Sequence, residues 1–512
     1  MHIFLYGPSG SGKSTVGKLL AQSLNLTFLD LDAEIEIVTG QGISQFMTEQ
    51  GEMAFRNAEN GMLQKAVEGE EKVVALGGGA LLRDENRTLA EATGQVILLE
   101  TNLPTLVERL SQDENQRPLL VGDLQEKLSA LLERRREHYA SFPLRIDATR
   151  LPEDVAWNIQ CLVGRYHLRS MGPGYDVIVQ EGGIDQLGEM LKSRELSGPA
   201  LVVSDTNVAP LYGERVLESL RRAGYNASQL VIPAGENHKN LETITSLWRG
   251  ALQAGLDRKS TIVALGGGVV GDMAGFVAAT YMRGCNWVAV PTTLLAMVDA
   301  SMGGKTGFDL PEGKNLVGAF HPPRLVLADP GALSTLPERE LRAGLAEVVK
   351  HGVIADPELY ALCAKGWEAV NVCLPEIVRR GMAVKVRVIE EDPYEQGVRA
   401  ALNLGHTIGH AVELVSGFSL LHGEAVGIGM VAEARLAERL TVAGKGLSDA
   451  LEKTLLALGL PVKIPENLKR DEIISTMKVD KKKAAGVVRF ALPVKIGEVK
   501  VGVKVENLEE AL

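Results

Sequence analysis

The stretch MHIFLYGPSGSGKST (residues 1–15) decides the fold of the first part of the chain. An apolar run leads into a glycine loop, and residues 7–14 match the pattern G-x-x-x-x-G-K-[ST]. Such glycines let backbone N–H groups surround phosphate oxygens, and a helix that follows directs its positive end at the same anion. We therefore expect a strand, a phosphate loop and a helix running from Lys13 to about Ser23.

Residue types within this loop predict how a nucleotide is held. Lys13 should reach the outer phosphates, and the Ser14 hydroxyl should bind Mg²⁺. A tight turn that merely requires glycine is the alternative, and placement directly after an apolar strand argues against it. The residues expected to bind ATP within the loop are Gly10, Ser11, Gly12, Lys13, Ser14 and Thr15.

The rest of the first part alternates strands with helices. Strands are expected in TFLDLD (residues 27–32), KVVALGGG (72–79) and QVILLE (95–100), and EDVAWNIQCLVGRY (153–166) is expected to close the domain as an amphipathic helix. Strands that alternate with helices predict a parallel sheet covered on both faces. The fold class is therefore α/β, with a nucleotide-binding P-loop domain built on a parallel sheet at the N-terminus.

A second α/β run follows the Gly-Pro-Gly linker in MGPGYD (residues 171–176). Strands in YDVIVQ, PALVVSD, QLVIPAGE, TIVALGGG and WVAVPTT predict a Rossmann-like NAD domain, and longer helical patterns from about Leu336 predict a mostly α-helical metal-binding domain. The very end, VVRFALPVKIGEVKV, should form a short hairpin. The expected domains are residues 1–168, 172–335 and 336–512.

Length, charge and cysteine content limit the number of domains, the classes of binding partner and the cellular compartment that we expect. A chain of 512 residues is expected to form about three units, since domains run ~100–200 residues. The net charge of −11 argues against a general nucleic-acid binder. Four cysteines without a C-x-x-C pair indicate a reducing cytosol. No signal peptide is expected, because MHIFLYGPSG (residues 1–10) has neither a basic region nor a long apolar region. No membrane span is expected, because the apolar residues 261–282 carry a GGG turn and Asp272. We therefore expect a cytoplasmic protein without a membrane partner.

A histidine cluster predicts a metal site in the second part. His406 and His410 are spaced i, i+4 and share one helical face; His422 follows, and Glu347 lies upstream. One carboxylate with two imidazoles, leaving positions open, is the catalytic form of a zinc site. A hydrogen-bonded structural histidine is the alternative for any one of them. The lysines of this half suggest a phosphorylated substrate; they are Lys305, Lys314, Lys350, Lys385 and the run Lys481, Lys482 and Lys483.

Three segments suggest a dinucleotide beside that metal. SDTNV (residues 204–208) ends a strand with an acid and an amide suited to ribose hydroxyls. PAGENHKN (233–240) places Glu236 and Lys239 after another strand, and ALGGGVVGD (264–272) provides a glycine turn that leads into a helix. The GGG turn alone is equally typical of an ordinary strand-to-helix connection.

The first part resembles shikimate kinases over nearly all of residues 1–165. The resemblance rests on FLDLDAEIE, GEMAFRNAE, ALGGGA, NQRPLL and RREHYASFP in this order. It implies that Asp30 helps to hold Mg²⁺, that Asp32 contacts shikimate and serves as the catalytic base, and that Arg117 lies over ATP. Three arginines adjoin in RRR, and the spacing to Tyr139 selects Arg135. The implied shikimate-binding residues are Asp32, Arg56, Gly77, Gly78, Gly79 and Arg135.

The second part is similar to 3-dehydroquinate synthases over essentially all of residues 172–512. The resemblance rests on RGCNWVAVPTTLLAMVDASMGGKTGFDLPEGKNLVGAFHPP, ELRAGLAEVVKHG, EEDPYEQGVRAALNLGHTIGHAVE and LLHGEAVGIGM. It implies Zn²⁺ or Co²⁺ bound by Glu347, His406 and His422. The implied NAD contacts are Asp205, Asn207, Glu236, Lys239, Gly267, Gly268, Asp272, Thr292, Thr293, Lys305 and Lys314. The implied substrate-binding and catalytic residues are Arg283, Asp299, Lys305, Lys314, Asn315, Lys350, Lys385, Arg399, Asn403 and His410.

Together the resemblances imply two enzymes of aromatic amino acid biosynthesis in one chain. One would phosphorylate shikimate with ATP, and the other would convert 3-deoxy-D-arabino-heptulosonate 7-phosphate to 3-dehydroquinate and phosphate with recycled NAD⁺. The steps are not consecutive, so we expect independent activities, with a homodimer through the synthase half. The alternatives are another small-molecule P-loop kinase, a glycerol-type dehydrogenase, another sugar-phosphate cyclase, and a scaffold without catalysis.

Overall fold

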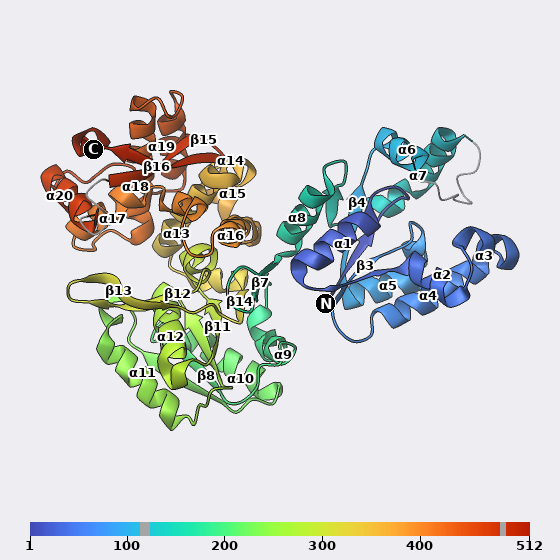
Figure 1. Ribbon diagram of the computed structural model, residues 1–512, viewed down its shortest axis with the longest axis horizontal. Coiled ribbons are helices and arrows are strands. Elements are labelled where there is room, and N and C mark those ends of the chain that lie inside the picture. Colours follow the sequence, from blue (N-terminus) through green and yellow to red (C-terminus); the bar gives the residue numbers. More distant parts are fainter. Residues whose placement is uncertain (113–122, 482–487) are drawn as a thin grey trace. The chain divides into compact units, whose positions relative to one another are not determined.

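The computed structural model places the chain in two compact units, Met1–His167 and Leu168–Leu512 (Figure 1). The structure describes residues 1–112, 123–481 and 488–512. Among the helices in these ranges, none combines the length and apolar character needed to cross a membrane. The expected α/β class with a helical C-terminal region is confirmed.

The first unit is built on a parallel sheet in the strand order β2-β3-β1-β4-β5. Its strands are β1 (His2–Tyr6), β2 (Thr27–Asp30), β3 (Lys72–Ala75), β4 (Gly94–Glu100) and β5 (Arg145–Asp147). Its helices are α1 (Lys13–Leu24), α2 (Leu31–Thr39), α3 (Ile43–Gln50), α4 (Glu52–Ala66), α5 (Asp84–Thr93), α6 (Leu103–Ser111), α7 (Leu124–Ala140) and α8 (Pro152–Val163).

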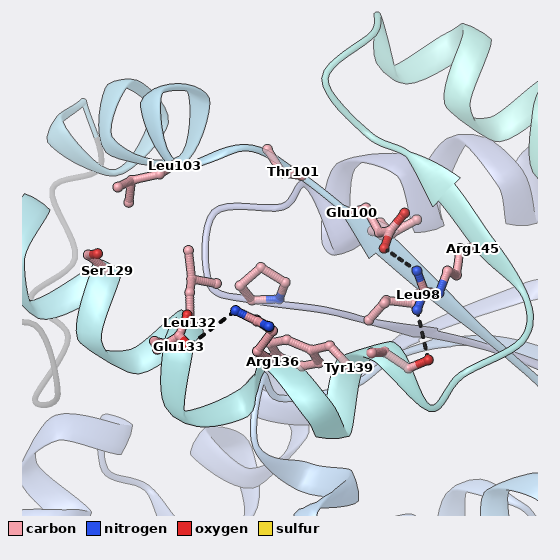
Figure 2. A pocket seen from close by; sticks show the side chains of 13 residues that line it. Leu98, Glu100, Thr101, Leu103, Ser129, Leu132, Glu133, Arg136, Tyr139 and Arg145 are labelled. Carbon is pink, nitrogen blue, oxygen red and sulfur yellow. Dashed lines mark hydrogen bonds and ion pairs between the residues drawn. The ribbon is translucent and has the colours of Figure 1, made fainter.

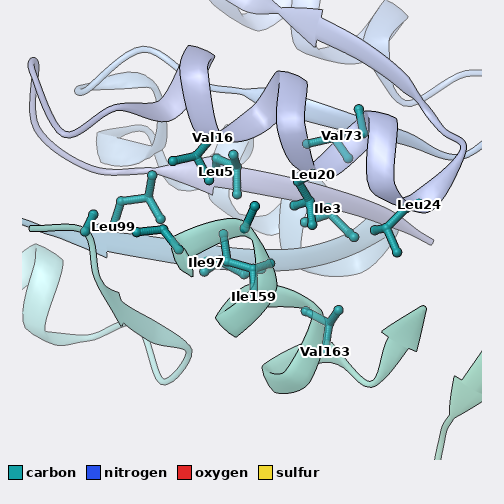
Figure 3. Close-up of a cluster of buried hydrophobic side chains, with 14 residues drawn as sticks. Ile3, Leu5, Val16, Leu20, Leu24, Val73, Ile97, Leu99, Ile159 and Val163 are labelled. Carbon is teal, nitrogen blue, oxygen red and sulfur yellow. The ribbon is translucent and has the colours of Figure 1, made fainter. Parts of the chain in front are cut away.

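Alternation along β1 divides its side chains between two cores. Ile3 and Leu5 pack with Leu20 of α1 and Ile159 of α8 on one face (Figure 3). Phe4 and Tyr6 join a separate cluster with α2, α4 and α7 on the opposite face. A period of two in a strand sends neighbouring side chains to opposite faces, so helices cover both sides of the sheet.

Two expected boundaries are wrong. The strand expected over residues 27–32 ends at Asp30, because the Asp30 carboxylate caps α2 by accepting hydrogen bonds from the Asp32 and Ala33 N–H groups. Asp32 therefore lies in the first turn of a helix. The closing helix expected to reach Tyr166 ends at Val163, because Gly164 adopts a left-handed conformation (φ 69°), and β6 (Arg165–Leu168) follows.

The second unit has a parallel sheet in which strands pair in the order β7-β14-β11-β10-β8-β9. Its strands are β7 (Tyr175–Val179), β8 (Ala200–Asp205), β9 (Ala227–Ile232), β10 (Thr261–Gly266), β11 (Asn286–Pro291) and β14 (Leu325–Ala328). The helices of this α/β part are α9 (Leu187–Lys192), α10 (Glu214–Arg222), α11 (Leu241–Gln253) and α12 (Gly268–Thr280).

An antiparallel hairpin that the sequence patterns do not predict lies between β11 and β14 in the chain and forms a separate two-stranded sheet. It comprises β12 (Lys305–Leu310) and β13 (Gly313–Phe320). The hairpin carries Lys305, Lys314 and Asn315, three residues expected to bind ligands. Their Gly- and Lys-rich setting lacks the apolar alternation by which strands are recognised.

The rest of the second unit is mostly helical, as expected. Its helices are α13 (Glu338–Ala355), α14 (Pro357–Cys363), α15 (Trp367–Asn371), α16 (Leu374–Glu391), α17 (His406–Val415), α18 (His422–Arg439), α19 (Leu447–Ala457) and α20 (Arg470–Lys481). The expected C-terminal hairpin is formed by β15 (Val488–Lys495) and β16 (Glu498–Val505). Its Phe490 and Leu492 pack against α17 and α18 residues, which stabilises the helices that carry the histidines.

Candidate active sites

The glycine loop of the first unit has the geometry of a phosphate cradle. Gly10 and Gly12 have φ angles of 82° and 91°, which side chains rarely tolerate. Lys13 Nζ donates to the carbonyl oxygens of Gly7 and Pro8, each at 2.9 Å, so the lysine spans the loop. The buried Ser11 hydroxyl has no hydrogen-bond partner among the described residues. These features fit the phosphates of a nucleotide, which would meet the start of α1.

The proposed magnesium ligands lie side by side. Ser14 Oγ donates to Asp30 Oδ2 at 2.5 Å, which joins the first turn of α1 to the end of β2. A hydroxyl and a carboxylate are the oxygen ligands that Mg²⁺ accepts, with water and phosphate completing its shell. This donor set fits the cation that accompanies a nucleotide.

Two arginine side chains converge on the glycines that follow β3. A Cβ built on Gly79 would lie 3.0 Å from Arg56 Nη2 and 3.1 Å from Arg135 Nη2. Arg135 Nη1 also donates to the Gly78 carbonyl at 2.7 Å, and a Cβ on Gly78 would lie 3.2 Å from the Gly7 carbonyl. The paired guanidinium groups are therefore adjacent to the phosphate loop. Two such forks can bind one carboxylate from two sides.

Glu59 is a residue of this site that sequence reasoning missed. It lies one helical turn after Arg56, ion-pairs with Arg56 Nη1 at 2.6 Å, and its side chain is fully buried. A Cβ on Gly77 would lie 2.6 Å from Glu59 Oε1 and 2.9 Å from Asp32 Oδ1, so both acids face the same glycine. Burial raises the pKa of Glu59, although Arg56 opposes that rise. The R-x-x-E spacing on a helix was the sequence signal.

A cavity of about 440 Å³ lies beside this region, between the end of β4 and α7 (Figure 2). Its charged lining residues pair with one another: Glu100 with Arg145 at 3.1 Å, and Glu133 with Arg136 at 3.3 Å. Among the described residues, none of those expected to bind ATP or shikimate lines it. Arg136 thus faces away from the guanidinium pair that its neighbour Arg135 joins. Arg117 falls outside the described residues.

Three helices of the second unit bring a carboxylate and imidazoles together. Glu347 lies in the middle of α13 and is fully buried, whereas His406 and His422 begin α17 and α18. Glu347 Oε1 lies 3.5 Å from His406 Nε2 and 3.6 Å from His422 Nε2. The more exposed His410 ring lies 5.0 Å from that of His406, centroid to centroid. The three predicted metal-binding groups therefore face one another.

The outer ring nitrogens of both histidines are already occupied. His406 Nδ1 lies 3.1 Å from the Leu404 carbonyl, and His422 Nδ1 lies 3.0 Å from Glu413 Oε2. Both partners are acceptors, so each Nδ1 carries a proton, and in a neutral ring Nε2 would be free to bind a metal on the side of Glu347. Without a metal, burial opposes the charge of His422, but the neighbouring Glu347 and Glu413 carboxylates raise its pKa to about 9. Glu347 Oε1 accepts no hydrogen bond among the described residues. Two imidazole lone pairs and a buried carboxylate oxygen fit a zinc-type ion with open positions.

A chain of buried charges extends from this centre. Lys350 Nζ forms an ion pair with Glu347 Oε2. Lys385 Nζ donates to Asp299 Oδ1 at 2.7 Å and to its carbonyl at 2.6 Å. Burial opposes the Asp299 charge, but Lys385 and Lys350 hold its pKa below the usual range. Burial conversely lowers the pKa of Lys385. Cations and carboxylates thus alternate in this buried polar cluster.

His351, also missed by sequence reasoning, lies beside this cluster of buried charges. Both of its ring nitrogens are buried without a hydrogen-bond partner among the described residues. One of them lies within 4.8 Å of carboxylate oxygens of Asp299 and Glu347. Burial, with Lys350 next to it, lowers the pKa of His351 to about 4, so the ring is neutral at physiological pH.

The expected dinucleotide residues gather at the carboxyl ends of the parallel strands. Lys239 Nζ lies 2.7 Å from Asp272 Oδ2 and donates to Asn315 Oδ1 at 2.6 Å. Gly267 separates β10 from α12, so the helix N-terminus is bare of side chains there. The buried Thr292 hydroxyl has no partner among the described residues. An open helix N-terminus and an unsatisfied hydroxyl fit a dinucleotide, whose pyrophosphate binds at such edges.

Other expected residues of this part occupy the strand ends and turns. Asp205 ends β8, and its carboxylate accepts hydrogen bonds from the Asn207 and Val208 N–H groups at 2.8 and 3.0 Å. Gly268 begins α12, and Thr293 Oγ1 accepts from the Ala296 N–H at 3.1 Å. These residues border the same edge of the sheet.

The contacts of the remaining substrate candidates do not bring all of them together. Lys305 Nζ ion-pairs with Glu395, to which Asn403 Nδ2 donates at 3.5 Å. Arg399 is buried, and its guanidinium donates to the Pro393 carbonyl. Arg283 is exposed in a left-handed turn (φ 66°) and forms no ion pair among the described residues. Lys482 and Lys483 lie outside the described residues, as does the side chain of Lys481.

Comparison with known families agrees with this division of chemistry. Residues 9–161 match the shikimate kinase model. Residues 229–343 and 344–483 match the N-terminal and C-terminal models of 3-dehydroquinate synthase. A curated relative named 3-dehydroquinate synthase, from Synechocystis sp., is 47% identical over 332 residues, which are 64% of this chain and 92% of the relative.

Two solved structures of other synthases are similar to the second unit. A 2-deoxy-scyllo-inosose synthase complexed with carbaglucose-6-phosphate, NAD⁺ and Co²⁺ is 28% identical, with a TM-score of 0.62 and coverage of 67% of this chain and 96% of that chain. ValA, a 2-epi-5-epi-valiolone synthase from Streptomyces hygroscopicus with NAD⁺ and Zn²⁺ bound, is 31% identical, with a TM-score of 0.60 and coverage of 66% and 94%. The chain belongs to the 3-dehydroquinate synthase family and carries a shikimate kinase domain ahead of it, so it is a bifunctional enzyme of the shikimate pathway.

Proposed function

We propose that the first unit phosphorylates shikimate through the residues that meet between the glycine loop and Gly79. The carrying observation is the guanidinium pair of Arg56 and Arg135, which adjoins the loop. In this proposal the pair holds the shikimate carboxylate, and Asp32 binds a ring hydroxyl and accepts its proton at a carboxylate oxygen. Glu59 holds Arg56 in place through their ion pair.

When bound, ATP supplies the phosphoryl group, and Mg²⁺ neutralises the negative charge of the phosphates. Lys13 would contact the outer phosphates, and Ser14 with Asp30 would hold the cation. The glycines Gly77, Gly78 and Gly79 keep space open for the substrate, because a Cβ at any of them would approach Glu59, the Gly7 carbonyl or Arg56. Alignment and charge neutralisation dominate phosphoryl transfer, so no covalent protein group is required.

Purified protein with ATP, Mg²⁺ and shikimate tests this half. ADP should form only when shikimate is present. The same assay with gluconate or a nucleoside monophosphate in place of shikimate tests the alternative kinase activities. ADP formation with those acceptors but not with shikimate would reject the proposal.

We propose that the second unit converts 3-deoxy-D-arabino-heptulosonate 7-phosphate to 3-dehydroquinate and phosphate. This proposal depends on the convergence of two imidazole Nε2 atoms on a buried carboxylate oxygen of Glu347. Glu347, His406 and His422 would hold a divalent metal. When bound, NAD⁺ supplies reversible hydride acceptance and the metal supplies Lewis acidity toward substrate oxygens.

The cationic side chains around this centre suit a phosphorylated carboxylate. Lys350, Lys385 and Arg399 are buried near the metal-binding groups, and such cations persist in an interior only beside anions. In the proposal they orient the substrate, together with Asn403, Lys314 and Asn315. Lys239 and Asp272 would orient the dinucleotide, and Asp299 would fix Lys385 through their hydrogen bonds.

Release of phosphate without net reduction of NAD⁺ tests this half. The protein with NAD⁺, Co²⁺ or Zn²⁺ and the heptulosonate phosphate should release phosphate while absorbance at the NADH wavelength stays constant. Accumulating NADH would favour a glycerol-type dehydrogenase instead. Phosphate release from a hexose phosphate rather than the heptulosonate would favour another sugar-phosphate cyclase, although those neighbours share less identity than the synthase relative.

We further propose three domains, at residues 1–168, 172–335 and 336–512, in a cytoplasmic protein that handles small molecules only. The net charge of −11 supports the absence of a nucleic-acid partner. Exposed Leu316 and Phe320 on β13 support a homodimer through the synthase half. Sedimentation of the full chain and of residues 168–512 measures that oligomeric state.

A further inference from the structure

Glu413 occupies a position between the metal-binding histidines and the β12–β13 hairpin. Its side chain, on α17, is 10% exposed. One carboxylate oxygen, Oε2, lies 3.0 Å from His422 Nδ1, and the other, Oε1, accepts from Lys314 Nζ at 3.0 Å. A single buried carboxylate thus contacts two elements that are distant in sequence.

The contact with His422 determines which nitrogen the ring offers. Because Glu413 accepts at Nδ1, a proton is held there, and Nε2, on the side of Glu347, is the nitrogen left to bind a metal. His422 begins α18, and its ring would otherwise rotate about its side-chain bonds. A carboxylate behind a metal-binding imidazole also makes that imidazole a stronger donor.

The contact with Lys314 holds the hairpin. Lys314 lies near the start of β13, and its ammonium also lies 3.4 Å from Glu236 Oε1 and 4.2 Å from the centre of the Phe418 ring. Two carboxylates and an aromatic face fix the direction of this side chain. The hairpin carries Lys305 and Asn315 as well, so its position sets those of other ligand-binding groups.

We propose that Glu413 is a positioning residue that orients His422 for the metal and ties the β12–β13 hairpin to the metal centre through Lys314. This inference rests on the proposed function, in that it takes Glu347, His406 and His422 as the metal-binding set. Glu413 itself touches neither the metal nor the substrate in this role.

The metal arm is tested by binding rather than turnover. The full-length protein and its Glu413→Gln variant are stripped with a chelator, and the Co²⁺ dissociation constant is measured by competition with a chromophoric chelator. The amide keeps the size of the side chain but cannot satisfy the imidazole N–H and the ammonium as a carboxylate does. The constant should rise ~10–100-fold, and the visible spectrum of bound Co²⁺ should change.

A second variant separates contact from charge. Glu413→Asp keeps the charge but retracts it by one methylene, so its Co²⁺ affinity should also fall. If Glu413→Gln loses the native circular dichroism spectrum, the Co²⁺ affinity of Glu413→Asp tests the role of Glu413 instead. Glu452→Gln, which removes an ion pair with Arg435 elsewhere, is the matched control and should bind Co²⁺ as the unaltered chain does.

The hairpin arm is measured by hydrogen–deuterium exchange in peptides spanning residues 305–320. Exchange should rise in both Glu413→Gln and Lys314→Gln, whereas Lys314→Gln should leave Co²⁺ affinity within about threefold, since it spares the contact with His422. Unchanged Co²⁺ affinity and spectrum in both Glu413 variants would overturn the role of Glu413 in orienting His422. Unchanged exchange in residues 305–320 would overturn its role in holding the hairpin. Failure of the unaltered chain to bind Co²⁺ would instead overturn the proposed metal centre.

Discussion

At the scale of single residues, function depends on charged groups held close to one another inside the protein. Arg56 is an example, because its guanidinium reaches Gly79 while Glu59 neutralises it from behind. Burial opposes the Arg56 charge, yet the ion pairs with Glu59 and Glu52 raise its pKa. The side chain therefore stays charged and keeps a defined direction, which a planar fork can use to bind a carboxylate.

Replacing Arg56 by Lys should weaken shikimate binding selectively. The ammonium keeps the charge but loses the two-point geometry, a loss of ~1.5–3 kcal/mol for a charged hydrogen bond, equivalent to a rise in the shikimate KM of roughly 10–100-fold. Steady-state kinetics measures this, with the ATP KM nearly unchanged. Arg136→Lys is the control, since Arg136 is 75% exposed and pairs with Glu133. An equal rise in both KM values would contradict the assignment.

At the scale of elements, helix ends hold the metal-binding residues in place. α17 begins at His406, and its preceding Gly405 has no side chain with which to cap it. Glu433 of α18 fills that role: it is fully buried and accepts from the N–H groups of Gly405 at 2.6 Å and Ile408 at 3.3 Å. Contact between helices thus fixes the direction from which His406 approaches Glu347.

Glu433→Ala should destabilise the second unit by about 1–3 kcal/mol, the cost of leaving buried donors without an acceptor. Urea unfolding, followed by a probe in that unit, measures the loss. Glu452→Ala removes an ion pair that includes a largely exposed arginine and should cost less than about 1 kcal/mol. Equal costs for the two substitutions would show that the buried cap is unimportant.

An ion pair in the first unit predicts its acid sensitivity. Burial alone would raise the pKa of Glu71, but Arg165, 2.7 Å away, and the N-terminal amine lower it to about 2. A pKa below the unfolded value of ~4.3 means that the stabilisation is complete above that value and is lost as the pH falls through about 2. The melting temperature of Glu71→Gln should lie below that of the unaltered unit at pH 6, and the difference should shrink toward pH 2. A difference independent of pH would contradict this.

At the scale of the whole molecule, two compact units carry separate chemistries on one chain. The division at His167 leaves the phosphate loop and its acceptor site in the first unit, and the metal-binding and dinucleotide residues in the second. The residues predicted for each catalytic set lie within one unit, apart from Arg117 and the lysines that fall outside the described residues. The two activities should therefore respond to substitutions independently.

Lys13→Ala should abolish phosphorylation of shikimate and leave phosphate release from the heptulosonate substrate unchanged. His406→Ala, or treatment with a metal chelator that spares Mg²⁺, should do the reverse. Both assays on the same preparation measure this independence. Loss of both activities from either substitution would show that the units depend on each other.

The sequence by itself determined the two parallel sheets, the helical region after Leu336 and the residue types of both sites. Local patterns suffice for these, because strand alternation, the glycine loop and the i, i+4 histidines are properties of neighbouring residues. Only the tertiary structure decided the roles of Glu59, Glu413, Glu433 and His351, whereas the spacing before Tyr139 already favoured Arg135. Burial and long-range contacts make a glutamate a cap or a partner of histidine, and no local pattern distinguishes it from a solvated glutamate.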